Sequence, residues 1–118
     1  MSLIFVKDLF KDGSNRFGVI ANDDNWYGLN LFLMDDGGIG VHHLLEMSKK
    51  LRANILEKQS SGETVEQYRE YFGVIFDKNH IQIVSLLTDE ILSTMPTTVF
   101  LEKLEECIEF IELNYKNQ

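Results

Sequence analysis

The fold of this chain is decided by the stretch VFLEKLEECIEFIELN, residues 99–114. Its apolar residues recur at alternating steps of three and four, which is the period of one face of an α-helix. They are Leu101, Leu104, Ile108 and Ile111, with Tyr115 at the next step. A helix with such a face must bury it against another layer, so the stretch predicts a terminal helix that packs on a sheet.

The sequence before this helix has the signals of a β-hairpin. Residues 71–76 and 81–86 are β-like runs on either side of a short polar turn. Pro96 disfavours a helix in the residues that precede it, and Thr97 or Thr98 can cap the helix that follows. The sequence therefore predicts that residues 95–98 close the sheet region and that the terminal helix follows.

The first third of the chain carries further β-like runs. Residues 17–21 and 26–34 flank the polar residues 22–25, which predicts another hairpin. Within residues 26–34 the apolar side chains alternate, as they do in a half-buried strand. Residues 3–10 predict a first strand or a short helix, because turn-forming residues follow them.

A second helical segment lies between the two groups of strands. From about residue 42 to about residue 59 the apolar period becomes helical. The residues aligned on that face are Leu44, Met47, Leu51 and Ile55. The order of elements predicts an α+β fold, a largely antiparallel sheet of hairpins packed against two helices. A length of 118 residues suits a single globular domain over residues 1–118.

The chain is acidic, with a formal net charge of -8 at pH 7. Most of the acidity belongs to the second half, because residues 61–118 hold four Lys and Arg against eleven Asp and Glu. Direct binding of nucleic acid relies on clustered Lys and Arg, so the composition argues against nucleic acid as a direct partner. A basic protein is the partner that this charge favours.

The features that report on the cellular compartment agree with one another. Cys107 is the only cysteine, so no disulfide can form within the chain. Charged residues interrupt the apolar start of the chain before an export signal can form. No run approaches the roughly twenty apolar residues that cross a bilayer. The sequence therefore predicts a cytoplasmic protein without a membrane contact.

The side of the predicted terminal helix opposite its apolar face is acidic. This acid stripe consists of Glu102, Glu105, Glu106, Glu109 and Glu112, with only Lys103 between them. Like charges four residues apart on a helix repel each other by a few tenths of a kcal/mol per pair. A helix face that is only solvated would more often alternate positive and negative charges, which favours a binding surface. The repulsion is small, however, and a solvated face therefore stays open as the second interpretation.

Other candidate contact residues lie in the loops of the first third. The candidates form a second acidic cluster with two aromatic neighbours, namely Asp23, Asp24, Asp35, Asp36, Trp26 and Tyr27. Buried aromatic residues beside charged ones are typical of interface hot spots. For Trp26 the alternative interpretation is packing at the edge of the predicted hairpin.

No stretch of the sequence has the pattern of an enzyme, a cofactor site or a metal centre. The loop 35–40 has neither the final Lys and Ser/Thr of one class of nucleotide loop nor a third Gly at the fixed spacing of the other, which favours a simple turn. Residues 23–34 lack two of the oxygen ligands of a calcium loop. His42 and His43 are adjacent and would point about 100° apart on a helix. Cys107 lies among apolar residues, which favours a small core residue.

In size, charge and element order, the whole chain resembles the immunity proteins of bacterial polymorphic toxin and contact-dependent growth inhibition systems. The parts that carry the likeness are the hairpin at 72–86, the turn at 95–98 and the acidic helix at 100–115. The resemblance implies tight stoichiometric binding to a cognate toxin domain, commonly a basic nuclease, whose active site the immunity protein blocks. The free protein is then expected as a monomer or a weak homodimer.

Two other classes of function remain open. A non-catalytic regulatory or scaffold module would self-associate through its sheet or through the apolar face of the terminal helix. A small enzyme or ligand carrier would use His42, His43 and the glycine-rich loop 37–40. Against the enzyme stands the lack of any convergent set of acid, base and nucleophile in the sequence.

Overall fold

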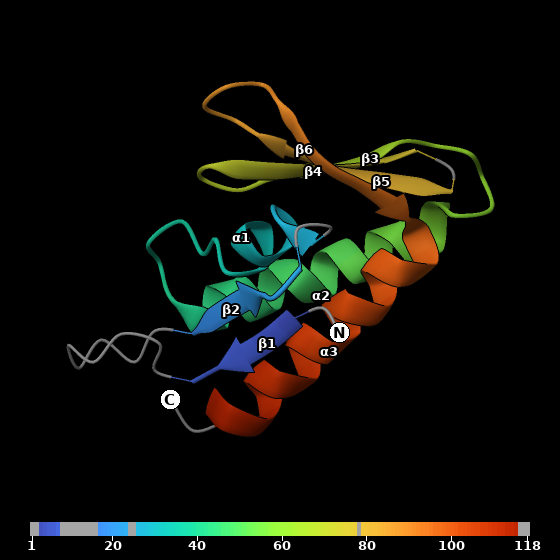
Figure 1. The fold of residues 1–118 in the computed structure, drawn as a ribbon. Coiled ribbons are helices and arrows are strands. Elements are labelled where there is room, and N and C mark those ends of the chain that lie inside the picture. The colour runs from blue at the N-terminus through green and yellow to red at the C-terminus, as the bar shows by residue number, and fades with distance from the viewer. Residues whose placement is uncertain (1–2, 8–16, 24–25, 78, 116–118) are drawn as a thin grey trace.

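The computed structural model describes residues 3–7, 17–23, 26–77 and 79–115 (Figure 1). Its elements are β1 (Leu3–Val6), β2 (Gly18–Ala21), α1 (Leu29–Leu33), α2 (Val41–Lys58), β3 (Val65–Tyr68), β4 (Phe72–Asp77), β5 (His80–Ser85), β6 (Ile91–Pro96) and α3 (Thr97–Tyr115). The predicted α+β class is confirmed. Among the described residues, no helix combines the length and the apolar character that crossing a membrane requires.

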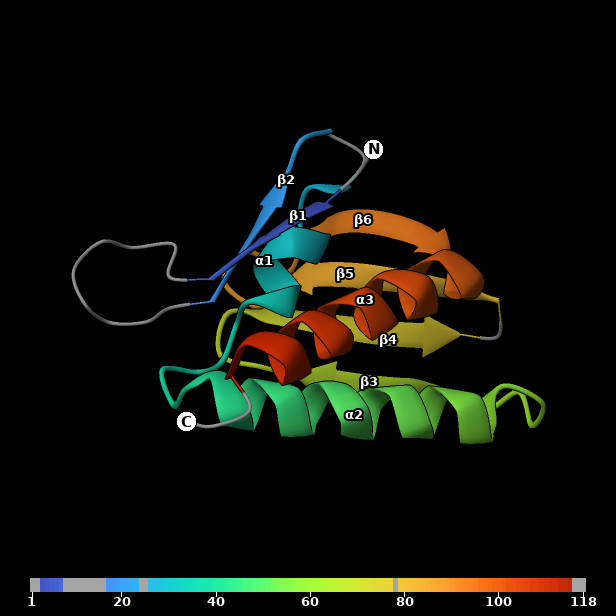
Figure 2. The same ribbon diagram turned by 90° about the horizontal axis from the view of Figure 1, so that it is seen from below.

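The larger sheet has the order β3-β4-β5-β6, and each strand pairs antiparallel with its neighbour in sequence. The predicted hairpin is confirmed as β4 and β5, whose last pair joins Asp77 to His80. The helices lie on one side of this sheet in both views, and no described element covers the other side (Figures 1 and 2). We call these two sides the inner face and the outer face.

The core lies between the inner face and the helices. The sheet contributes Val74, Phe76, Ile81, Ile83 and Met95, which alternate along their strands as a half-buried sheet requires. The predicted terminal helix is confirmed as α3, and its buried residues include Phe100, Leu104, Ile108 and Ile111. The second predicted helix is confirmed as α2, with Leu44, Leu51 and Ile55 buried. Helical and strand periodicity thus converge on one cluster of buried residues.

The start of α3 differs from the prediction. Thr97 and Thr98 are the first two residues of the helix rather than caps, and Thr97 is 2% exposed. Its hydroxyl oxygen has no hydrogen-bond partner among the described residues. The backbone N–H of Thr97 instead donates to the carbonyl of Asn79, because β6 runs into α3 without a loop.

The hairpin predicted from residues 17–21 and 26–34 is wrong. Leu29–Leu33 forms the short helix α1, and β2 pairs with β1, so that Ile4 lies opposite Ile20. The physical reason is that Leu29, Phe32 and Leu33 share one helical face and are all 0% exposed. Of the first predicted strand, residues 3–6 are confirmed as β1, and residues 8–10 lie outside the described residues.

The strands β3 and β6 were not predicted, and they form the two edges of the larger sheet. Each has a weak sequence signal, because β3 has four residues and β6 ends in Pro96. Proline lacks a backbone N–H, so it is tolerated mainly at edges and ends of strands. Both edge strands carry part of the outer face.

A buried guanidinium joins the sheet edge to the helices. Arg69 is 8% exposed and follows β3. Its Nη1 donates to the carbonyl of Phe32 at 2.6 Å, and its Nε donates to Oε1 of Gln67 at 3.1 Å. The guanidinium carbon lies 3.9 Å from the centre of the Phe32 ring. Burial lowers the pKa of Arg69 to about 10, which the charge of Asp35 partly opposes.

Gly28 gives a test of the turn into α1. Its φ is +95°, and a Cβ there would lie 2.8 Å from the Cβ of Leu92. We expect Gly28→Ala to lower the free energy of unfolding by about 2–4 kcal/mol, from backbone strain and overpacking together. The control is Gly62→Ala. The φ of Gly62 is +75°, and an added Cβ would have no atom within 4 Å, so backbone strain alone should cost about 1–2 kcal/mol. Equal losses in urea unfolding would contradict the close packing of Gly28 on Leu92.

Candidate functional site

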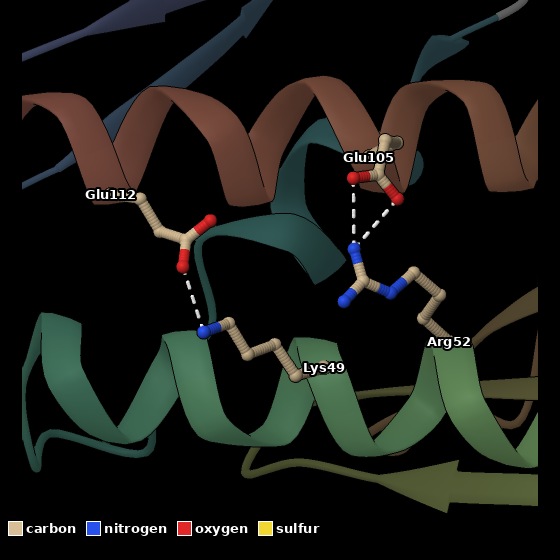
Figure 3. A network of polar contacts seen from close by, with 4 residues as sticks. All are labelled: Lys49, Arg52, Glu105 and Glu112. Atoms are coloured by element: carbon tan, nitrogen blue, oxygen red, sulfur yellow. Dashed lines mark hydrogen bonds and ion pairs between the residues drawn. The ribbon is translucent and has the colours of Figure 1, made fainter.

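Two glutamates of the acid stripe on α3, Glu105 and Glu112, point toward cations of α2 (Figure 3). Nη1 of Arg52 donates to both carboxylate oxygens of Glu105, at 2.8 and 2.7 Å. Nζ of Lys49 lies 2.7 Å from Oε2 of Glu112. The cations therefore offset the repulsion that the sequence of α3 alone implies, and these glutamates help to join the helices.

The rest of the stripe is neutralised only in part. Nζ of Lys103 lies 3.0 Å from Glu106 and 3.8 Å from Glu102. Among the described residues, no ion pair includes Glu109, which is exposed. Ion pairs at a protein surface stabilise the protein by about 0.2–1 kcal/mol each. The stripe is thus a mixed surface of five acids and nearby cations rather than an uncompensated acid array.

The second acidic cluster separates into a buried and an exposed part. Asp35 is 9% exposed, and its Oδ2 accepts hydrogen bonds from the backbone N–H groups of Tyr71 at 2.8 Å and Phe72 at 3.2 Å. The side chain of Asp36 accepts from the backbone N–H of Gly38, at 2.8 Å on the surface. Asp35 therefore holds the start of β4 against the loop before α2.

The aromatic neighbours also separate. Tyr27 is 55% exposed, whereas Trp26 is half-buried against the core. Nζ of Lys103 lies 5.6 Å from the Trp26 ring centre, so Trp26 meets α3. Trp26 also lines a shallow hollow of about 490 Å³ beside Leu92–Pro96 and Val99. Asp23 is exposed, and Asp24 lies outside the described residues.

The outer face carries an apolar row that the sequence analysis missed. Strand pairing aligns Tyr68 with Gly73, Gly73 with Val84, and Val84 with Ile91. Because Val74 and Ile83 point to the helices, the neighbouring residues of this row point outward. Tyr68 is 49% exposed and Ile91 is 57% exposed. Val84 between them is half-buried. Exposed apolar side chains that gather on one face mark an interaction site more often than scattered ones do.

The adjoining turns extend this row at the same end of the sheet. The N–H of Leu86 donates to the carbonyl of Tyr71 at 2.9 Å, which places the β3–β4 turn beside the β5–β6 loop. Tyr71 is 47% exposed and Leu87 is 76% exposed. We call this region the sheet-end surface, with the apolar residues Tyr68, Tyr71, Val84, Leu87 and Ile91 and the acids Glu66, Glu70, Asp89 and Glu90.

Among the described residues, the acids of the sheet-end surface take part in no ion pair, unlike most of those on α3. All four are exposed. Among the described residues from 65 to 96, the one Lys or Arg is Arg69, which is buried. The hydroxyl of Tyr68 donates to Oε2 of Glu66 at 2.9 Å, so one acid also orients the aromatic ring. The arrangement is an apolar centre with an acidic rim.

The residues considered for chemistry are not grouped. His42 is exposed and His43 is half-buried at the start of α2. Cys107 is fully buried, and burial raises the pKa of its thiol to about 12, although Arg69 opposes part of that rise. The described ranges contain no group of three or more His, Cys, Asp or Glu placed to hold a metal ion.

Comparison of the chain with protein-family models, curated proteins and solved structures finds no match.

The two neighbouring aspartates give a test of which acid is structural. We expect Asp35→Ala to lower the free energy of unfolding by about 1–3 kcal/mol, because it leaves the N–H groups of Tyr71 and Phe72 without their acceptor. Asp36→Ala should change it by no more than about 0.5 kcal/mol, since its contact is exposed. Urea unfolding of both variants measures the difference, and equal values would refute the structural role of Asp35.

Cys107 gives a test of the buried core. At pH 8 we expect a disulfide reagent such as DTNB to leave the native thiol unmodified and to modify it in urea. Between the ordinary pKa of 9.0 and the folded value of about 12, the unfolded chain releases the thiol proton and the folded chain keeps it. The contribution of Cys107 to stability is therefore full below pH 9 and falls as the pH rises through this window. Rapid labelling of the native protein would contradict its burial.

Proposed function

We propose that this protein binds a basic protein domain in the cytoplasm and inhibits it, in the manner of the immunity proteins that it resembles. The observation that supports this best is the sheet-end surface, where exposed apolar residues lie inside a rim of uncompensated acids. A basic toxin domain, with a nuclease as the expected class, would supply the missing cations.

The physical basis of the proposal is charge complementarity. A nuclease groove is built to attract phosphates, so it also attracts a surface of carboxylates. The net charge of -8 raises the association rate at long range, and the apolar contact then slows dissociation. The acid stripe contributes to the long-range attraction, because its five glutamates outnumber the three described cations that pair with them, which are Lys49, Arg52 and Lys103.

A second candidate is the self-associating module. It is favoured by the outer pair of the small sheet, since Ile4 and Ile20 lie opposite each other and are 44% and 41% exposed. The apolar face of α3 does not serve this candidate, because it is buried within the chain. Light scattering separates the two candidates, since the inhibitor proposal expects a monomer or only weak dimers at micromolar concentration.

The proposal is tested by capture followed by inhibition. Tagged protein is recovered from its source cell, bound proteins are identified by mass spectrometry, and a captured basic protein is purified and assayed alone. We expect one basic protein at one-to-one stoichiometry, whose activity falls to zero as one equivalent of this protein is added.

The electrostatic part of the proposal has its own readout. The association rate should fall at least about tenfold between low and high salt, while the dissociation rate changes little. Capture without any loss of the partner's activity would refute inhibition. The proposed function as a whole would be refuted if the tagged protein retained no basic protein from cells that are shown to express the suspected basic partner.

A further inference from the structure

We propose that the sheet-end surface is the contact site itself, and that it receives an apolar or aromatic side chain that Lys or Arg residues flank on a basic protein. This inference rests on the proposed function for the identity of the partner. It adds the place of contact and the chemistry of the segment that occupies it.

The apolar centre is held in place before any partner binds. A Cβ on Gly73 would lie 2.6 Å from Cδ1 of Tyr68, so the Tyr68 ring covers the backbone of Gly73. Its hydroxyl is held by Glu66 at 2.9 Å. An aromatic ring fixed in this way loses little side-chain freedom on binding, which is the property of a hot-spot residue.

The loop that carries Leu87 and two of the acids is also fixed in shape. The hydroxyl of Ser85 accepts from the N–H groups of Leu87 and Thr88, and the carbonyl of Ser85 accepts from Asp89 at 2.9 Å. Asp89 has φ +62°, the one positive φ outside glycine among the described residues. The loop thus presents an exposed leucine and its neighbouring acids in a defined arrangement.

The charge of the rim selects the occupant. A second copy of this chain would bring Glu66, Glu70, Asp89 and Glu90 together with the same four acids, and like charges across an interface are unfavourable. Nucleic acid and acidic membrane surfaces are repelled for the same reason. A partner that carries Lys or Arg around an exposed apolar side chain can instead pair its cations with the acids of the rim and pack its apolar side chain on the centre.

Affinity measurements on matched variants test the place of contact. Leu87→Ser and Ile91→Ser remove side chains that are 76% and 57% exposed, so neither should unfold the protein. Their controls are Leu113→Ser on α3 and Leu56→Ser on α2, with exposures of 76% and 55%. With the captured partner, we expect a loss of affinity of about tenfold or more for the first two and less than about twofold for the controls.

A charge-matched pair tests the rim. Glu90→Lys and Glu109→Lys change the net charge equally, but only Glu90 belongs to the sheet-end surface. We expect Glu90→Lys to slow association with the partner several-fold more than Glu109→Lys does. Equal effects of the two variants, together with equal affinities of the four serine variants, would overturn the proposed contact site and leave the proposed function standing.

A defined peptide tests the surface without any captured partner. The blocked tripeptide Arg-Trp-Arg is titrated into isotope-labelled protein, with blocked Glu-Trp-Glu as the control, and amide chemical shifts are followed. We expect saturable shifts from the basic peptide alone, concentrated in residues 66–73 and 84–91. No saturable shift, or shifts concentrated on the helices, would overturn the inference. Binding at the sheet end, combined with failure to capture a basic protein, would refute only the proposed function.

Discussion

The guanidinium of Arg69 lies in the interior and binds groups from three separate parts of the chain. It donates to the carbonyl of Phe32 in α1, lies within 3.4 Å of the Ser48 hydroxyl in α2 and donates to Gln67 in β3. A buried cation deprived of such partners costs several kcal/mol, so the end of β3 can take few positions relative to these helices. Gln67 adds a bond of 3.0 Å to the carbonyl of Met47, which acts in the same sense. The outward-facing Tyr68 and the turn at Tyr71 flank Arg69 in sequence, and their placement depends on this constraint.

Asp35 complements this arrangement from the other side of the turn. By accepting the N–H groups of Tyr71 and Phe72, it fixes the first residues of β4, while Arg69 fixes the last residues before the turn. The two buried charges attract each other, which contributes to keeping Arg69 protonated in spite of its burial. Interior electrostatics thus set the shape of the exposed end of the sheet. The ion pairs of α3 with α2 are partly exposed to solvent, which weakens them, and they add little to that constraint.

The parts of the fold that the sequence predicted are those with long, unbroken periodicity. Residues 99–114 keep one apolar face throughout, so no neighbour was needed to identify α3. Residues 26–34 fit both the alternating pattern of a strand and the period of a helix. In the structure β2 pairs with β1, so this segment has no strand partner and part of it forms α1. The sequence showed the glutamates of the acid stripe on one helix, but the cations that pair with Glu105 and Glu112 come from α2, and Arg52 lies 53 residues before Glu105. The sheet-end surface depends on the register of Tyr68, Gly73, Val84 and Ile91, and nothing in the spacing of these residues along the chain gives that register.

The one-sided placement of the helices divides the tasks of the larger sheet between its two faces (Figure 2). Residues on the inner face pack into the core, where a change of a single methylene group alters stability. Residues on the outer face have no such neighbours, and substitutions at exposed positions usually change stability by less than about 0.5 kcal/mol. Alternate positions along the same strand are therefore under different constraints. The outward-facing residues of the sheet can therefore change to fit a new partner, while the inward-facing residues, and with them the fold, stay the same.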